Sequence, residues 1–356
     1  MRPWVRKMSD KPVALSRLDE PAEFDGVHTL QPRLGHGRFF TRCFLAGGLL
    51  LLLVLFWKVG LGAIGQVLVK AGWAIPLVFI PFAIVVVCEA LGWWFAFPSS
   101  RQFLRFDDVI RLTVATMAVH LLTPSITQAG EFMKFHLLRR SGVEVDIGTA
   151  SVVVAKTTIM IAELLFIGLG MTLALAYVSV DPVIAISVAL GVIVMGVGVG
   201  SVLIVQRIGL FRPLIWVSRR FSAFERILAR HEQWLSSTER IIREHIDERR
   251  RFGWSCFWFF LGWTAGILEA WVFLNVLGLP ANIESALVIQ VWSVIVTRLT
   301  AFIPGNVGTL EAGIVLSFSF LGLSPESAMT FAVLRRLRQI GWIMAGLRYL
   351  AKMSRG

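Results

Sequence analysis

The feature that most constrains this chain is a helix-breaking stretch inside a long apolar region, at residues 298–313. Pro304 cannot donate a backbone hydrogen bond, and Gly305 and Gly308 tolerate backbone angles that other residues avoid. A helix that enters this stretch must therefore break. Within lipid, broken backbone is tolerated only where protein or a water-filled cavity surrounds it. The stretch predicts a re-entrant loop that lines a site within the membrane, with an ordinary surface loop as the alternative.

A matching stretch lies 180 residues earlier in the chain. Pro124 and Glu131 have the same spacing as Pro304 and Glu311. At the same offset, further residues match without a gap: Glu89-Ala90 with Glu269-Ala270, Gly142-Val143 with Gly322-Leu323, and Lys156 with Arg336. Several matches at one offset predict an internal duplication. Duplicated halves whose helices break at matching positions are typical of transporters and point to their binding sites.

The composition is that of a polytopic helical membrane protein. Of its 356 residues 56% are apolar and only 16% are charged, and the mean hydropathy is +0.72. A soluble domain of this size carries far more charge. The net charge of +12 mostly sets membrane orientation in such a protein. We therefore expect membrane lipids as partners and no nucleic acid.

Apolar runs and their flanks predict an all-α protein with six full spans and two re-entrant hairpins. The spans are expected at 40–59, 73–97, 147–178, 183–205, 254–278 and 326–350, and the hairpins at 109–138 and 286–321. Basic residues stand at both ends of the first hairpin: Arg101, Arg105, Arg111, Arg139 and Arg140. Neither 279–284 nor 322–326, at the ends of the second hairpin, contains Lys or Arg. By the positive-inside rule the two repeats are inverted, and both termini are cytoplasmic.

These patterns divide the chain into five segments. We expect a disordered cytoplasmic tail at 1–38, the first span and first membrane repeat at 39–205, a basic linker at 206–252, the second membrane repeat at 253–350, and a short cytoplasmic tail at 351–356. Apolar residues recur at helical spacing in the linker: Phe221, Phe224, Leu228, Leu235 and Ile242. They predict an amphipathic helix in the cytoplasm or on the inner membrane surface. A simple connector between the repeats is an equal alternative.

Charged residues at membrane depth need a partner or a function, because their burial in lipid is costly. The basic candidates are Lys156, Arg298, Arg335, Arg336 and Arg338, and the acidic ones are Glu89, Glu131, Glu163, Glu269 and Glu311. Ion pairs that hold the helices together would account for all of them. Alternatively, they line a polar cavity whose guanidinium groups bind an anionic head group, since arginine binds phosphate through two parallel hydrogen bonds.

We expect substrate contacts from both repeats. The candidates are Glu89, Pro124, Gly130, Glu131 and Lys156 in the first, and Glu269, Arg298, Pro304, Gly305, Gly308, Glu311, Arg335, Arg336 and Arg338 in the second. Glu311 could cap the broken backbone, or it could face the basic cluster and be displaced by an anionic head group. We favour displacement, because a shorter Ser, Asn or Asp could cap as well.

No residue set indicates catalysis, a metal or a cofactor. Cys43, Cys88 and Cys256 show neither a disulfide framework nor metal-ligand spacing, and the histidines are scattered. We therefore expect a protein that is not an enzyme. An intramembrane enzyme with Asp or Glu as its acid–base group is the distant alternative.

The chain resembles the flippase-like integral membrane family, which includes the transmembrane half of lysylphosphatidylglycerol synthases. The resemblance covers about residues 43–350 and depends on three motifs: Phe302-Ile-Pro304-Gly305-Asn-Val-Gly308-Thr-Leu-Glu311-Ala, Leu321-Gly-Leu-Ser-Pro-Glu326-Ser-Ala, and Leu122-Thr-Pro124 with Gly130-Glu131 in the first half. Leu334-Arg335-Arg336-Leu-Arg338 is similar to the branch encoded with hopanoid biosynthesis. The synthases carry a soluble aminoacyl-transferase domain after this region, and the present sequence ends at Gly356, so we expect no aminoacylation.

The resemblance implies that the chain moves a lipid, or a lipid-linked anionic head group, between the leaflets of a bacterial inner membrane. The main alternative is a non-transporting membrane subunit of a lipid- or glycan-synthesis complex, for example one associated with hopanoids. In that alternative, residues 206–252 would bind the partner proteins.

Overall fold

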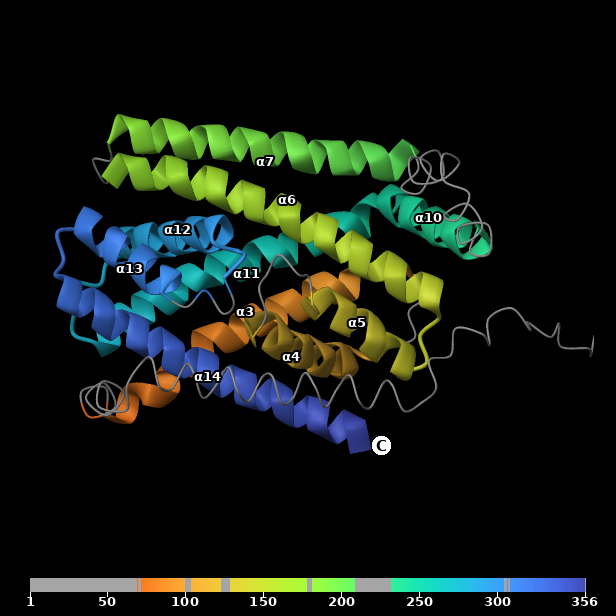
Figure 1. The fold of residues 1–356 in the computed structure, drawn as a ribbon, viewed down its shortest axis with the longest axis horizontal. Coiled ribbons are helices and arrows are strands. Elements are labelled where there is room, and N and C mark those ends of the chain that lie inside the picture. The colour runs from red at the N-terminus through yellow and green to blue at the C-terminus, as the bar shows by residue number, and fades with distance from the viewer. Residues whose placement is uncertain are drawn as a thin grey trace, which may run out of the picture. The chain divides into compact units, whose positions relative to one another are not determined.

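A computed structural model describes residues 69, 72–99, 104–122, 129–177, 181–208, 232–303, 306 and 308–355. All of these residues belong to one compact unit, which extends from 44 to 356. The regular elements in the described part are helices (Figure 1), namely η2 Gly72–Ala74, α3 Ile75–Phe95, α4 Phe106–Leu122, α5 Ala129–Arg140, α6 Val145–Tyr177, α7 Pro182–Ile208, α10 Glu232–Asp247, α11 Arg249–Val276, α12 Ile283–Leu299, α13 Thr309–Phe320 and α14 Pro325–Arg355. The expected tail at 1–38 and the expected first span at 40–59 lie outside the described residues.

Four of the described helices are long and apolar enough to cross a membrane. Their apolar segments are Pro76–Phe95, Val145–Ala174, Ala185–Gln206 and Arg249–Val276. They agree with the spans predicted at 73–97, 147–178, 183–205 and 254–278. Helix α14 occupies the remaining predicted span, 326–350, as one continuous helix of 31 residues. Helix α14 is not among the four apolar helices because it contains several arginines. Its role as a membrane span therefore stays a prediction.

The 180-residue offset of the sequence recurs in the helix boundaries. Helices α5 and α13 each have 12 residues and begin 180 positions apart, as do the first residues of α6 and α14. Both short helices end in the same way, with Gly142 at φ 79° and Gly322 at φ 67°. Only glycine adopts such angles without strain, and it closes a helix end there. The amide of the next residue then donates to the carbonyl of Leu138 or Phe318, at 3.1 and 2.9 Å.

Equivalent helices of the two halves run in opposite directions. In Figure 1, α6 runs from the right of the view to the left, and α14 runs from the left back to the C-terminus at the right. Helix α3 likewise runs opposite to α11, against which it packs. Each half also contains one pair of short packed helices, α4 with α5 and α12 with α13. The helix break predicted within 298–313 is observed, because α12 ends at Leu299 and α13 begins at Thr309.

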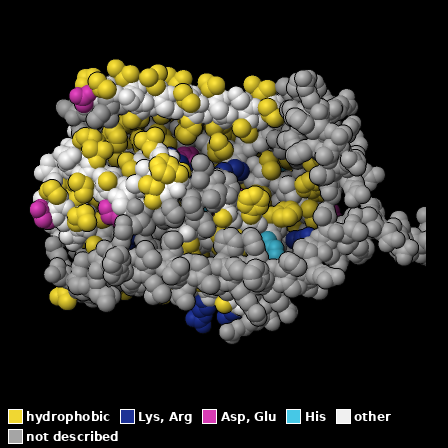
Figure 2. Space-filling model, viewed as in Figure 1, with side chains coloured by type: hydrophobic (Ala, Val, Ile, Leu, Met, Phe, Trp, Pro, Cys, Tyr) yellow, Lys and Arg dark blue, Asp and Glu magenta, His cyan; other side chains and the backbone are white. Residues whose placement is uncertain are grey.

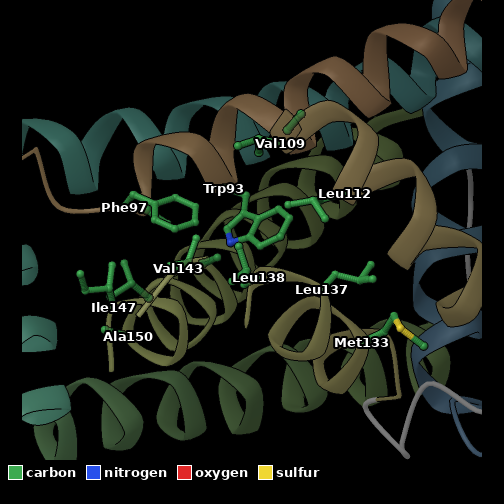
Figure 3. Close-up of a cluster of buried hydrophobic side chains, with 14 of the residues drawn as sticks. Trp93, Phe97, Val109, Leu112, Met133, Leu137, Leu138, Val143, Ile147 and Ala150 are labelled. Carbon is green, nitrogen blue, oxygen red and sulfur yellow. The ribbon is translucent and has the colours of Figure 1, made fainter. Parts of the chain in front are cut away.

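Large apolar side chains pack between the helices of each half. In the first half, Trp93 lies between Phe97 and Leu112 (Figure 3), and all three are almost fully buried. In the second half, Phe273, Phe318 and Phe331 form a corresponding cluster. A third apolar cluster joins the halves, with Phe166 and Ile167 of α6 against Val291 and Trp292 of α12.

Helix α7 covers one side of α6 and has an apolar outer face. Its exposed residues include Val183, Ile186, Leu190, Ile193, Val194 and Val197. Hydrophobic side chains accordingly cover the upper edge of the molecule in Figure 2, where α7 lies in Figure 1. An apolar outer face of this kind suits contact with lipid tails.

The described part of the basic linker packs on the helical bundle. Helix α10 contacts α6, and Leu235 and Ile242, two of the five apolar positions that predicted an amphipathic helix, are buried. The other three lie outside the described residues. Helix α6 can contact α10 outside the lipid because its 33 residues make it about 50 Å long, whereas a hydrocarbon core is about 30 Å thick. The described part of the linker thus contains a helix at 232–247 whose two apolar positions Leu235 and Ile242 are buried in the protein.

Candidate functional site

A charged cavity of about 530 Å³ lies between the two halves. Helices of both halves line it, among them α3, α5 and α6 from the first and α11, α12 and α14 from the second. The lining includes five basic side chains and four carboxylates: Lys134, Lys156, Arg298, Arg335 and Arg338, with Glu89, Glu131, Glu163 and Glu269. A charged side chain costs free energy when it is buried in lipid. The nine charged side chains instead gather around one cavity, where they can neutralise one another.

Helices α5 and α6 supply one charged end of the cavity. Glu131, the third residue of α5, has its carboxylate 3.2 Å from Lys134 Nζ and 3.8 Å from Lys156 Nζ. These side chains remain partly exposed, at 24% for Glu131, 20% for Lys134 and 35% for Lys156. A Cβ on Gly130 would lie 3.1 Å from His120 Cβ, so glycine allows α5 to start close against α4. The Lys134 ammonium also lies 5.0 Å from the centre of the Trp93 ring.

Helices α11 and α14 supply a second charged group, which is more deeply buried. Glu269 Oε1 lies 2.8 Å from Arg338 Nη2 and 3.7 Å from Arg335 Nε. Arg335 also donates through Nη2 to Gln290 Oε1 at 2.8 Å. The Arg338 guanidinium lies 3.8 Å from the centre of the Phe82 ring, a cation–π contact that suits a desolvated charge.

A third ion pair joins the two halves across the cavity. Arg298, near the end of α12, pairs with Glu163 of α6. Glu163 is buried, whereas Arg298 is partly exposed and lies over the Trp263 ring at 5.4 Å. This pair couples the helix that leads into the predicted re-entrant loop to the longest helix of the first half.

The Arg336–Glu311 pair lies outside the set of residues that line the cavity. Arg336 is only 1% exposed and donates to both carboxylate oxygens of Glu311, at 2.7 and 3.1 Å. It also donates to the Asn306 carbonyl at 2.9 Å and to Gln339 Oε1 at 2.8 Å. Glu311 Oε2 accepts from the Gly308 amide at 2.8 Å. These two residues therefore bind each other and the turn before α13, and their contact with a head group stays a prediction.

The two Glu–base pairs are equivalents at the 180-residue offset. Glu131 and Glu311 are each the third residue of a 12-residue helix, and their partners Lys156 and Arg336 lie on the long helix that follows. The pair in the first half lines the cavity, whereas in the second half Arg336 is almost fully buried and Glu311 is 20% exposed outside the cavity lining. The same pairing of a glutamate with a basic residue thus has a different environment in each half.

The helices that carry these pairs lie within a region that matches a known protein family. The model of the family described as "Lysylphosphatidylglycerol synthase TM region" matches residues 40–346. The chain belongs to this family. The resemblance noted in the sequence is thereby confirmed, and the chain is a multi-pass membrane protein of the lysylphosphatidylglycerol synthase TM family. The hopanoid branch stays a prediction. No curated protein and no solved structure matched the chain.

Within this family member, the predicted site residues fall into three groups. Eight of them line the cavity: Glu89, Gly130, Glu131, Lys156, Glu269, Arg298, Arg335 and Arg338. Three others are joined by hydrogen bonds at the start of α13: Gly308, which has φ 89°, donates to Glu311, and Glu311 binds Arg336 of α14. Pro124, Pro304 and Gly305 lie outside the described residues.

Some cavity residues were not predicted from the sequence. Lys134 follows Glu131 by three positions on a helix, a spacing that places both on one face and could have identified it. Gln290, a polar residue in an apolar run, and His120, near a predicted helix break, gave weaker signals. Among the described residues, no group of three or more His, Cys, Asp or Glu side chains could hold a metal ion.

Proposed function

We propose that this family member moves a lipid with an anionic head group, or a lipid-linked anionic head group, between the leaflets of a bacterial inner membrane. The charged cavity carries the proposal. It measures about 530 Å³, takes lining residues from both halves, and is surrounded by helices such as α7 whose outer faces are apolar. A head group can enter such a cavity while the lipid tails stay in the hydrocarbon.

The cavity can replace the hydrogen bonds that a phosphate loses when it leaves water. Guanidinium and ammonium groups form charge-assisted hydrogen bonds with phosphate oxygens, and arginine can form two in parallel. The carboxylates that now contact these bases balance their charge while the cavity is empty of substrate. An anion that replaces a carboxylate as the partner of a base therefore adds little net charge to the membrane interior.

We further propose that the two halves are inverted repeats that give alternating access to the cavity. The opposite directions of α6 and α14, together with the basic ends of the first hairpin, support this topology. The topology includes six full spans and two cytoplasmic termini. Movement of one half against the other would open the cavity to each side in turn.

The alternative role, as a non-transporting subunit of a synthesis complex, has less support from the described residues. It assigns partner binding to the amphipathic linker, but α6 already occupies the apolar face of α10 at Leu235 and Ile242. Catalysis is also less favoured, because Glu131, Glu163 and Glu269 each contact a basic side chain. That arrangement suits charge balance more than proton transfer.

Reconstitution into liposomes tests the proposal. Dithionite reduces a fluorescent nitrobenzoxadiazole (NBD) label only in the outer leaflet, so translocation exposes NBD-phosphatidylglycerol from the inner leaflet. We expect the fluorescence of inner-leaflet NBD to fall faster in liposomes with the protein than in liposomes without it. The assay would be run both with and without an ion gradient. Arg298→Gln should slow translocation, whereas Arg240→Gln, at an exposed pair on α10, should not. Folded protein that moves neither NBD-phosphatidylglycerol nor a labelled prenyl phosphate would contradict the proposal.

A further inference from the structure

We propose that Glu131, Lys134 and Lys156 form the exchangeable anion site of the cavity, in which a phosphate group displaces the Glu131 carboxylate from the two lysines. This assignment rests on the proposed function for its natural ligand, the phosphate of a lipid head group. Glu131 then acts as a built-in competitor that neutralises the lysines when no head group is bound.

The geometry of the first-half pair suits exchange. Both lysines line the cavity, and each contacts a different oxygen of Glu131, at 3.2 and 3.8 Å. Lysine contacts of this length are loose compared with a paired guanidinium, and all three side chains remain partly exposed. Two ammonium groups on neighbouring helices that share one carboxylate can instead share one phosphate, which has more acceptor oxygens.

The equivalent pair in the second half, Arg336 and Glu311, is less suited to exchange. Arg336 binds Glu311 through two hydrogen bonds, and it also donates to Asn306 and Gln339. Arg336 is 1% exposed, against 35% for Lys156, and neither Arg336 nor Glu311 lines the cavity. Helix position is the same in both halves, so the difference lies in the base, its further partners and its burial.

The surroundings keep the lysines in place during an exchange. Trp93 holds the Lys134 ammonium through its ring at 5.0 Å. Other charged or titratable groups of the cavity approach from separate helices: Glu89 from α3, His120 from α4, Glu163 from α6 and Arg298 from α12. Of these, Arg298 already pairs with Glu163. Glu131 is thus the carboxylate whose departure frees both lysines at once.

Binding measurements on the purified full chain test the site without any transport step. Calorimetric titration would use dihexanoyl phosphatidylglycerol as a lipid probe and inorganic phosphate as a free anion. Glu131→Gln removes the competing charge and keeps the shape of the side chain, so we expect affinity to rise about tenfold, the effect of one charge-assisted contact. Lys134→Gln and Lys156→Gln should each weaken binding by about the same factor.

Glu244→Gln is the control, because it makes the same change at an exposed ion pair on α10, outside the cavity. It should leave the affinity of the folded protein unchanged. If Glu131→Gln does not fold, the two lysine variants carry the test. Tightening for both probes supports exchange with recognition of the phosphate alone, and tightening for the lipid only supports exchange with added contacts to the rest of the lipid.

Unchanged affinity in Glu131→Gln, or normal affinity in both lysine variants, would overturn the exchange site. These outcomes are distinct from failure of the proposed function. A protein that binds both probes with the expected Glu131 dependence, yet moves no lipid in liposomes, would keep the exchange site and lose the transport role.

Discussion

At the scale of single residues, equivalent positions in the two halves have different partners. Glu89 and Glu269 match at the 180-residue offset, and both line the cavity. Glu269 lies within 4.0 Å of two buried arginines, whereas in the described part of the chain Glu89 has no basic nitrogen within that distance. A sequence repeat therefore predicts where a carboxylate lies but not how it is neutralised, since that depends on side chains from other helices.

We expect Glu269→Gln to destabilise the protein far more than Glu89→Gln. The first change leaves Arg335 and Arg338 buried without their shared counter-ion, and removal of one partner from a buried pair costs about 3–5 kcal/mol. Thermal unfolding in one detergent would compare the two variants. Equal losses of stability would mean that the contacts of Glu269 with the two arginines contribute little.

At the scale of elements, helix existence could be predicted from the sequence but helix environment could not. Apolar runs gave the positions of α3, α6, α7 and α11 to within a few residues, because a membrane span needs a fixed length of apolar sequence. The apolar spacing of the linker also predicted α10. Its partner could not be inferred, because an apolar helix face fits lipid and protein equally well.

The packing of α10 should weaken in acid because of His245. Burial disfavours the imidazolium and lowers the pKa of His245 to about 4; nearby Arg251 lowers it as well, and Glu248 partly opposes both. The unfolded value is about 6.5, so the unfolded chain binds a proton first. The contribution of His245 is complete above about pH 6.5 and is lost as pH falls toward 4, by at most about 3 kcal/mol.

Unfolding temperatures of wild type and His245→Gln, measured between pH 4 and pH 7, check this expectation. The wild type should lose stability toward low pH by more than the variant does, because glutamine does not titrate. Parallel pH curves for the two proteins would show that His245 does not couple the packing of α10 to pH.

At the scale of the whole molecule, alternating access to the cavity requires two halves with opposite orientations in the membrane. The helix directions in Figure 1 and the basic residues around the first hairpin support this arrangement. The sequence offset predicted the repeat, and the positive-inside rule predicted its inversion. The sequence could not show that the first-half Glu131–Lys156 pair lines the cavity while Arg336 in the second half is almost fully buried, since both pairs read as the same motif.

Side-specific labelling tests the inversion. Ser141 and Ser324 are both exposed and lie just after the short helix of each half. In a variant without native cysteines, Ser141→Cys and Ser324→Cys should react with a membrane-impermeant maleimide from opposite sides, Ser141→Cys from the cytoplasm. Reaction of both from the same side would exclude inverted repeats.

Obstruction of the cavity tests the central claim, that the head group passes through it, most directly. Thr297 lines the cavity, whereas Ser319 is exposed on α13 and is not among the lining residues. Thr297→Cys and Ser319→Cys, each in a variant without native cysteines, would be labelled with a bulky maleimide before reconstitution with NBD-phosphatidylglycerol. We expect label at position 297 to stop translocation and label at position 319 to leave it unchanged. Unchanged translocation with position 297 fully labelled would contradict the central claim.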